Sequence, residues 1–253
     1  MKINIDGLNL NYICEGEGRD VLILHGWGAS IPTMLPIHNH LKDRFKVYTL
    51  DLPGFGESDE PKEVWGSHDY ADFVKKFMDK QGIKEIILIG HSHGGRISIV
   101  LSSSFPDLVK QMILIDSAGI IPKRKAKYYF KVYSFKALKK IYNLLFFYVD
   151  KEKRLEKFYK RFGSTDYKAT DGIMRNIMVK VVNDNLESLL KDIKAQTLLV
   201  WGKDDEDTPV YMGEVMEREI SGSGLVVLEN AGHFSYLDQF QRFKLITDSF
   251  LEQ

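Results

Sequence analysis

Nearly continuous apolar runs, separated by stretches of helical spacing, constrain the fold of this chain more than any other feature. The expected strands are residues 2–5, 8–14, 21–24, 46–51, 85–90, 111–116, 197–201 and 225–228. The expected helices are residues 33–42, 68–81, 93–105 and 210–220, followed by a last helix from residue 236 onward. Uninterrupted apolar strands are typical of a parallel sheet that is covered on both faces. The alternation therefore predicts an α/β fold with a mostly parallel eight-stranded sheet and helices on both faces.

The alternation stops after Asp116-Ser117-Ala118-Gly119 and resumes only at residue 197. The interval between is helical, aromatic and charged. We therefore predict one α/β core, residues 1–120 and 191–253, that is interrupted by a helical cap, residues 121–190. A chain of 253 residues is long enough to bury the core of one such domain.

Charge is distributed unevenly between these two parts. Residues 122–161 carry 14 Lys or Arg and 3 Asp or Glu, although the whole chain has 35 of each sign. Tyrosines and phenylalanines are interleaved with these bases. One interpretation is a pair of amphipathic helices whose aromatic side chains cover a site while the lysines face water. The other is a surface that attracts an anionic substrate, an acidic carrier protein or an anionic membrane.

Three further features bear on the class of protein. The zero net charge argues against a dedicated nucleic-acid binder, whose affinity comes from neutralising phosphates. The single cysteine, Cys14, has no partner for an internal disulfide, which agrees with a reducing compartment. The amino terminus resembles a short strand, and no apolar stretch is long enough for a membrane span. We expect a soluble, cytoplasmic protein.

The segment Gly90-His91-Ser92-His93-Gly94-Gly95 follows an apolar strand and opens a helix. A serine hydroxyl becomes a useful nucleophile when a sharp turn holds it out of its surroundings and supplies a base. Glycines on both sides fit such a turn, because side chains there would collide with the strand and the helix. A helix N-cap would also explain a serine, but not both glycines. We predict that Ser92 is a catalytic nucleophile.

A nucleophilic serine needs a general base, and His233 is the best candidate. It lies in Asn230-Ala231-Gly232-His233-Phe234, in the loop after the last expected strand. Ligand sites of parallel sheets lie at the carboxyl ends of the strands. The six competing histidines fit less well. His38 and His40 are expected on a surface-like helix or its loop, His68 at a helix start and His25 in a different element. His91 and His93 flank the serine in a tight turn and point away from it.

The base in turn needs a carboxylate to orient it. We choose Asp205, in the acidic loop of residues 202–209 that follows the expected strand 197–201. Asp204 and Asp207 of the same loop are expected to be solvated. Asp116, at the end of an earlier strand, is the rival, since some enzymes that this chain resembles place their acid there.

Attack on a carbonyl creates an oxyanion that requires hydrogen-bond donors. The segment His25-Gly26-Trp27-Gly28 follows the strand of residues 21–24, and its glycines allow close approach of the backbone. We expect the backbone N–H groups of Trp27 and His93 to form the oxyanion hole.

Taken together, these segments resemble the α/β-hydrolase superfamily, over nearly the full length outside the insertion. The matching motifs include residues 25–28, Asp51 to Ser58, residues 90–95, the loop 202–209 and Gly232-His233. The resemblance implies that nucleophile, acid and base fall on Ser92, Asp205 and His233, in the family's chain order. Serine in place of aspartate at position 92 argues against haloalkane dehalogenases and epoxide hydrolases.

Two subgroups of that superfamily are similar to this chain, namely small carboxylesterases and carbon–carbon bond hydrolases of dienoate ring-cleavage products. In the second subgroup a tryptophan often follows the base, where this chain has Phe234, so an esterase is favoured. We predict cleavage of an ester, thioester or amide of a small to medium carboxylic acid through an acyl-enzyme, without metal or organic cofactor. Arg175 and Phe234 are candidate substrate-binding residues. Carbon–carbon cleavage, acyl transfer, a ligand receptor of hydrolase shape and an interfacial lipase remain as alternatives.

Overall fold

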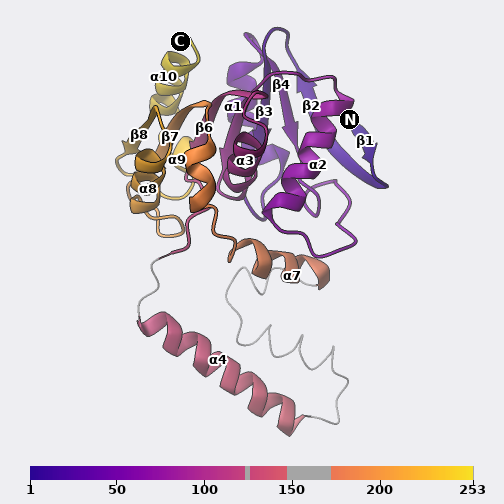
Figure 1. Ribbon diagram of the computed structural model, residues 1–253, viewed down its shortest axis with the longest axis vertical. Coiled ribbons are helices and arrows are strands. Elements are labelled where there is room, and N and C mark those ends of the chain that lie inside the picture. Colours follow the sequence, from indigo (N-terminus) through magenta and orange to yellow (C-terminus); the bar gives the residue numbers. More distant parts are fainter. Residues whose placement is uncertain (123–125, 147–171, 253) are drawn as a thin grey trace.

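Eight strands form one sheet at the centre of the structure (Figure 1), a computed structural model that describes residues 1–122, 126–146 and 172–252. The order across the sheet is β1-β2-β4-β3-β5-β6-β7-β8. The strands are β1 Lys2–Ile5, β2 Leu8–Glu15, β3 Asp20–Leu24, β4 Lys46–Leu50, β5 Ile86–His91, β6 Val109–Ile115, β7 Gln196–Gly202 and β8 Ser223–Leu228. The pairs β1/β2 and β2/β4 are antiparallel and all other pairs are parallel. The predicted mostly parallel, eight-stranded sheet is confirmed.

Helices cover both faces of this sheet (Figure 1). The helices of the described residues, including those away from the sheet, are α1 Ile31–Leu41, α2 Ser67–Lys80, α3 His93–Ser104, α4 Ala126–Leu145, α7 Gly172–Val181, the 3-10 helix η1 Glu187–Asp192, α8 Tyr211–Glu219, α9 Ser235–Asp238 and α10 Phe240–Leu251. Side chains of α2, α3 and α8 belong to one apolar cluster, and those of α1 and α10 belong to a second.

The parallel strands β3, β5 and β7 supply side chains to the two clusters alternately. In β3, Val21 and Ile23 pack with α1 and α10, whereas Leu22 and Leu24 pack with α2 and α3. All four side chains are fully buried. Burying one such side chain stabilises the fold by about 1.5–3 kcal/mol. Because both faces of the sheet are covered, neither set of alternate residues can be polar, which explains the continuous apolar runs in the sequence.

The surroundings of His38 differ from the expected surface-like helix, although a structural role is one of the expected outcomes for it. It is fully buried rather than on a surface-like helix. Its Nδ1 lies 2.8 Å from Thr49 Oγ1 and its Nε2 lies 3.3 Å from Glu15 Oε2. The reason is helical spacing, because His38 follows Met34 by four residues and therefore shares the stripe of α1 that packs on the sheet.

Helices α4 and α7 lie within the predicted cap, whose middle part, residues 147–171, is outside the described residues. Figure 1 places α7 at the edge of the core, with α4 farther from the sheet. Met174 of α7 is buried in the core cluster. Lys180 Nζ donates to the Val64 carbonyl (3.1 Å), and Asp184 accepts from Ser67 N (2.9 Å). The chain that returns from the predicted cap is therefore bound to the start of α2.

Candidate active site

Ser92 occupies the turn between β5 and α3, where the backbone is strained. Its φ is 50° and its ψ is −108°, a conformation that side chains with a Cβ rarely adopt. The residue is partly exposed, whereas the strand before it and the first turn of the helix after it are buried. The turn therefore holds the hydroxyl at the carboxyl edge of the sheet, away from the core.

The flanking glycines are required by close contacts of the backbone. A Cβ on Gly90 would lie 2.6 Å from the Gly94 carbonyl oxygen. A Cβ on Gly94 would lie 2.2 Å from the carbonyl oxygen of Leu24, at the end of the neighbouring strand β3. Real Cβ atoms do not approach backbone oxygens this closely, so larger residues at either position would displace the turn.

Ser92, His233 and Asp205 come together at this edge although they are far apart in the sequence. His233 Nε2 lies 3.0 Å from Ser92 Oγ, and His233 Nδ1 lies 2.9 Å from Asp205 Oδ2. Both distances are within hydrogen-bond range. The side chain of Asp205 is fully buried and that of His233 is 17% exposed. Hydroxyl, imidazole and carboxylate therefore form a continuous hydrogen-bonded chain.

The His233–Asp205 pair is stabilised in its charged form. Burial by itself would lower the pKa of His233, but the hydrogen bond and negative charge of Asp205 raise it above its ordinary value. Burial would likewise raise the pKa of Asp205, but the hydrogen bonds from His233 and Thr208 outweigh burial and lower it. The carboxylate thus stays ionised and favours a proton on the imidazole.

Thr208 is a member of this cluster that the sequence analysis missed. Its hydroxyl lies 2.7 Å from Asp205 Oδ2 and 2.9 Å from the Asp116 carbonyl oxygen, so its single proton is shared between these acceptors. The backbone N–H groups of Asp207 and Thr208 donate to Asp205 Oδ1 at 2.8 and 2.9 Å. Asp205 is therefore fixed by its own turn. The signal available in the sequence was a threonine three residues after an aspartate in a loop.

Asp116, the rival acid, has other partners. Its Oδ1 accepts from Gly202 N at 2.7 Å, and its Oδ2 accepts from Ser235 N at 3.1 Å. Burial raises the pKa of Asp116 to about 7. Asp116 therefore joins the end of β7 to the start of α9, while Asp205 contacts the imidazole.

The histidines nearest the serine are buried and neutral. His91 Nε2 donates to the His233 carbonyl oxygen at 2.7 Å, and burial lowers the pKa of His91 to about 3. His25 Nδ1 donates to the Gly26 carbonyl oxygen at 2.7 Å and its Nε2 accepts from Leu52 N at 2.9 Å. Burial lowers the pKa of His25 to about 4. His91 thus supports the loop that carries His233, a role that the sequence did not indicate.

Comparison with known proteins agrees with this architecture. A family model described as the alpha/beta hydrolase fold matches residues 21–240. The chain belongs to the α/β hydrolase fold family.

Individual relatives of this α/β hydrolase are distant but nearly full-length. The "uncharacterized hydrolase YugF" of Bacillus subtilis (strain 168) is 26% identical over 92% of this chain and 90% of the relative. The 2-hydroxy-6-oxo-6-phenylhexa-2,4-dienoate hydrolase of Comamonas testosteroni is 27% identical over 96% of this chain and 91% of the relative. The crystal structure of a bacterial membrane phospholipase A superposes with a TM-score of 0.78 at 26% identity, covering 100% of this chain and 85% of that one.

The segment that carries Trp27 lies directly against the nucleophile turn of this α/β hydrolase. A Cβ on Gly26 would lie 3.2 Å from Ser92 Cβ. His93 is the first residue of α3, and the first N–H groups of a helix have no partner within it. The rings of Trp27 and His93 are in contact, with centroids 5.4 Å apart. The two proposed oxyanion donors thus lie on adjoining segments next to Ser92.

The two predicted substrate-binding residues lie on different elements. Phe234 is 40% exposed, and its ring centroid is 5.0 Å from that of His91 and 5.7 Å from that of His233. Arg175 is partly buried on α7, next to Met174, whose side chain closely approaches Gly54. Phe234 is therefore beside the catalytic candidates, while the role of Arg175 remains a prediction.

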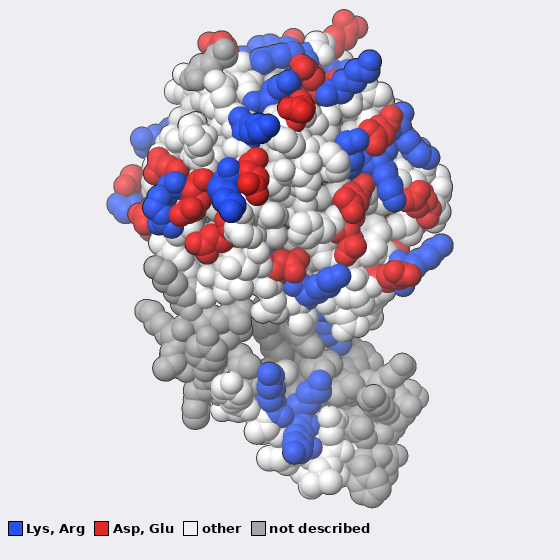
Figure 2. Space-filling model, viewed as in Figure 1, with Lys and Arg blue, Asp and Glu red and all other residues white. Residues whose placement is uncertain are grey.

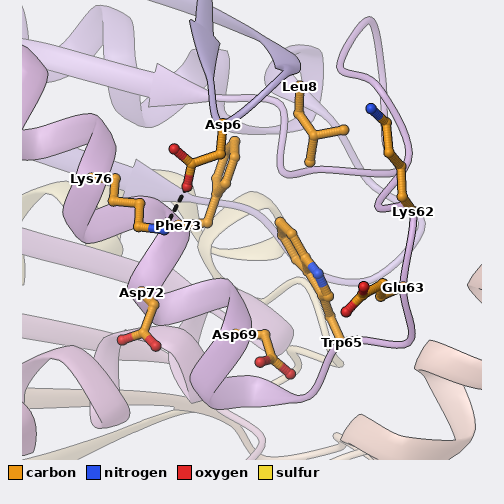
Figure 3. Close-up of a pocket in the computed structure, with 9 residues that line it drawn as sticks. All are labelled: Asp6, Leu8, Lys62, Glu63, Trp65, Asp69, Asp72, Phe73 and Lys76. Atoms are coloured by element: carbon orange, nitrogen blue, oxygen red, sulfur yellow. Dashed lines mark hydrogen bonds and ion pairs between the residues drawn. The ribbon is translucent and has the colours of Figure 1, made fainter.

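Two other features of the structure concern ligands. Ligand atoms of Asp205, Asp207 and His233 lie within 4.8 Å of one another, a spacing that would suit a metal ion. Two of these residues already form the hydrogen bond described above, which accounts for the cluster. Separately, a cavity of about 290 Å³ lies between α2 and the β1–β2 turn, where Trp65 and Phe73 form an apolar wall (Figure 3). Its lining includes none of the candidate site residues.

Proposed function

We propose that this α/β hydrolase is a serine hydrolase that cleaves an ester, thioester or amide of a small to medium carboxylic acid. The observation that carries the proposal is the hydrogen-bonded chain from Ser92 through His233 to Asp205, at 3.0 and 2.9 Å. This set of groups is sufficient for nucleophilic acyl transfer.

In the first half of the reaction, Ser92 Oγ attacks the carbonyl carbon while His233 Nε2 takes the hydroxyl proton. The resulting imidazolium is stabilised by Asp205, and the backbone N–H groups of Trp27 and His93 donate to the oxyanion. The tetrahedral intermediate then collapses, and the C–O, C–S or C–N bond to the leaving group breaks. His233 returns its proton to the leaving group, and the acyl group remains on Ser92 as an ester.

In the second half, water replaces the leaving group. His233 Nε2 removes a proton from the water as its oxygen attacks the acyl carbon, and the same two N–H groups hold the oxyanion. Collapse releases the carboxylic acid, and His233 returns the proton to Ser92 Oγ. An alcohol in place of water would give acyl transfer by the same steps.

A second candidate function is hydrolysis of a carbon–carbon bond in a dienoate. It is favoured by the similarity to the Comamonas testosteroni dienoate hydrolase, which is 27% identical. Phe234, in the position after the base, favours the ester, because the dienoate subgroup often has tryptophan there. Hydrolysis of an ester, thioester or amide therefore remains our first proposal.

A substrate panel tests the choice between the two. We would measure kcat/KM for p-nitrophenyl esters of graded chain length and for a dienoate ring-cleavage product, using wild-type protein and Ser92→Ala. The proposal expects ester hydrolysis with a pre-steady-state burst of p-nitrophenol close to one equivalent, absent in the variant. Efficient dienoate cleavage with negligible ester turnover would replace the proposal by its alternative. Stoichiometric binding without turnover of either class would point to a receptor.

A further inference from the structure

Helix α4 exposes a set of large apolar side chains to solvent. The exposed members are Tyr133 (65%), Leu138 (41%), Ile141 (54%), Leu144 (74%) and Leu145 (63%). Single exposed side chains of this size are normal, but a contiguous group of them marks an interaction surface. We call these five residues the α4 apolar face.

Helical spacing places these side chains on one side of α4. Tyr133, Ile141 and Leu144 fall on one stripe, because they are separated by eight and three residues. Leu138 and Leu145, seven residues apart, form the adjacent stripe. Phe135, Tyr142 and Phe146 lie on the opposite side, where they are partly buried, and the rings of the last two are 4.5 Å apart. The helix thus has a partly buried aromatic side and an exposed side that is aliphatic apart from Tyr133.

Basic side chains border the α4 apolar face. Residues 133–145 contain three lysines and no Asp or Glu. Lys136 and Lys140 are exposed and lie next to the Tyr133–Leu144 stripe, and Lys136 Nζ is 5.9 Å from the centre of the Tyr133 ring. In Figure 2, basic side chains gather on this helix, whereas basic and acidic side chains alternate over the core. The surface therefore complements an apolar layer that carries negative charge.

We propose that α4 docks this α/β hydrolase on the surface of an anionic lipid bilayer. An exposed apolar stripe flanked by lysines is the pattern of helices that lie in the membrane interface. Figure 1 shows α4 at the end of the molecule away from the sheet. None of the helices among the described residues has the length and apolar character to cross a bilayer. An acidic protein would match the lysines but would not require five exposed apolar side chains.

The test is flotation of the full-length protein with vesicles of phosphatidylcholine, with or without phosphatidylglycerol. We would use the Ser92→Ala background, so that the lipids stay intact and the outcome does not depend on the proposed function. We expect binding to the anionic vesicles that falls strongly between about 0.1 M and 1 M salt, where the screening length shortens from about 10 to 3 Å.

Matched variants locate the binding surface. Leu144→Ser should weaken vesicle binding about tenfold, since it removes one of the apolar side chains that would enter the interface. Leu245→Ser on α10 removes an equally exposed leucine, 73% against 74%, and should change nothing. Lys136→Gln and Lys140→Gln should each weaken binding about fivefold and reduce its salt dependence, unlike Lys194→Gln on the core.

Three results would overturn the proposal. The first is no binding to anionic vesicles, including the case in which an acidic acyl-carrier protein binds instead. The second is equal binding to neutral vesicles. The third is binding that Leu144→Ser and Leu245→Ser weaken alike. A far-UV circular dichroism spectrum and a thermal unfolding midpoint like those of the parent protein would show that Leu144→Ser is folded; if it is not, Ile141→Ser replaces it.

Discussion

The loops after β6 and β7 each bury an aspartate at the carboxyl edge of the sheet, yet the two carboxylates behave in opposite ways. Asp116 accepts hydrogen bonds from the backbone of Gly202 and Ser235, and burial raises its pKa to about 7. Asp205 is also buried, but the hydrogen bonds from His233 and Thr208 lower its pKa. Burial is common to both, so the difference lies in their partners.

Strand order explains which aspartate meets the base. His233 lies in the loop after β8, and β8 pairs with β7 but not with β6. The loop after β7 is therefore the neighbour of the histidine loop, while the loop after β6 is one strand farther away. A carboxylate at a strand end becomes a candidate for catalysis only if an imidazole is within hydrogen-bond distance.

The largest contrast should come from replacing each acid by its amide. Asp205→Asn should lower kcat by about 10⁴, because an amide neither stabilises the imidazolium nor holds the productive tautomer. Asp116→Asn should lower kcat by less than about tenfold, because its carboxylate contacts backbone groups rather than His233. Steady-state kinetics on one ester checks both. An equal loss of kcat in the two variants would show that the two carboxylates act as a unit and would contradict their different roles.

Stability should depend on pH through Asp116. Its folded pKa of about 7 is above the ordinary value near 3.9. The protonated form therefore stabilises the fold below about pH 4, and this contribution is lost as the pH rises through about 7. The upper limit is about 4 kcal/mol, because roughly three pKa units separate the two values at about 1.4 kcal/mol each.

Urea unfolding across that pH range checks this prediction. Asp116→Asn should remove the decline in unfolding free energy, while Asp204→Asn, an exposed acid of the loop after β7, should retain it. If the two variants have parallel stability curves, Asp116 is ionised in the folded protein at all these pH values.

Thr208 offers a finer test of the Asp205 site. Thr208→Val keeps the shape but removes the hydroxyl that lies 2.7 Å from Asp205 Oδ2. Hydrogen bonds to charged groups contribute about 1.5–3 kcal/mol, so kcat should fall by about 10- to 100-fold. Thr208→Ser retains the hydroxyl and should remain close to wild type. Similar rates for the valine and serine variants would remove Thr208 from the account.

The smallest expected effect is a shift in the pH profile. His233 must be neutral to accept the serine proton, so activity should rise as the pH passes its pKa, which Asp205 raises above its ordinary value. In Asp205→Asn the acid limb of kcat/KM should move to lower pH, and in Asp116→Asn it should move much less. A limb that stays in place in Asp205→Asn would mean that another group controls it.

The main elements of the fold could be predicted because burial on both faces leaves a clear pattern. Strand β1 begins and ends as expected, and α3 differs by one residue at its end. His38 shows where such prediction stops. The sequence alone predicts a surface position for a polar residue of α1. His38 is buried because Thr49 and Glu15, from distant parts of the sequence, provide its hydrogen-bond partners.

At the candidate active site, as in the fold, local sequence patterns could be interpreted but contacts between distant residues could not. Ser92, Asp205 and His233 could be predicted because each follows a strand, and parallel strands bring such loops to one edge. His91 could not, because only packing creates its contact with the His233 carbonyl oxygen. Thr208 left only a local signal, its position three residues after Asp205, which does not show that its hydroxyl contacts the carboxylate. Composition indicated a basic insertion, but which α4 side chains are exposed depends on how that helix packs.

The most direct measurement is active-site labelling with a fluorophosphonate, followed by peptide mass spectrometry. The hydrogen-bonded chain predicts rapid, stoichiometric modification of Ser92 that is abolished in Ser92→Ala, slowed by orders of magnitude in Asp205→Asn and nearly unchanged in Asp116→Asn. Labelling at another residue, or equal labelling rates in wild type and Asp205→Asn, would contradict the assignment of Ser92, His233 and Asp205 as one catalytic unit.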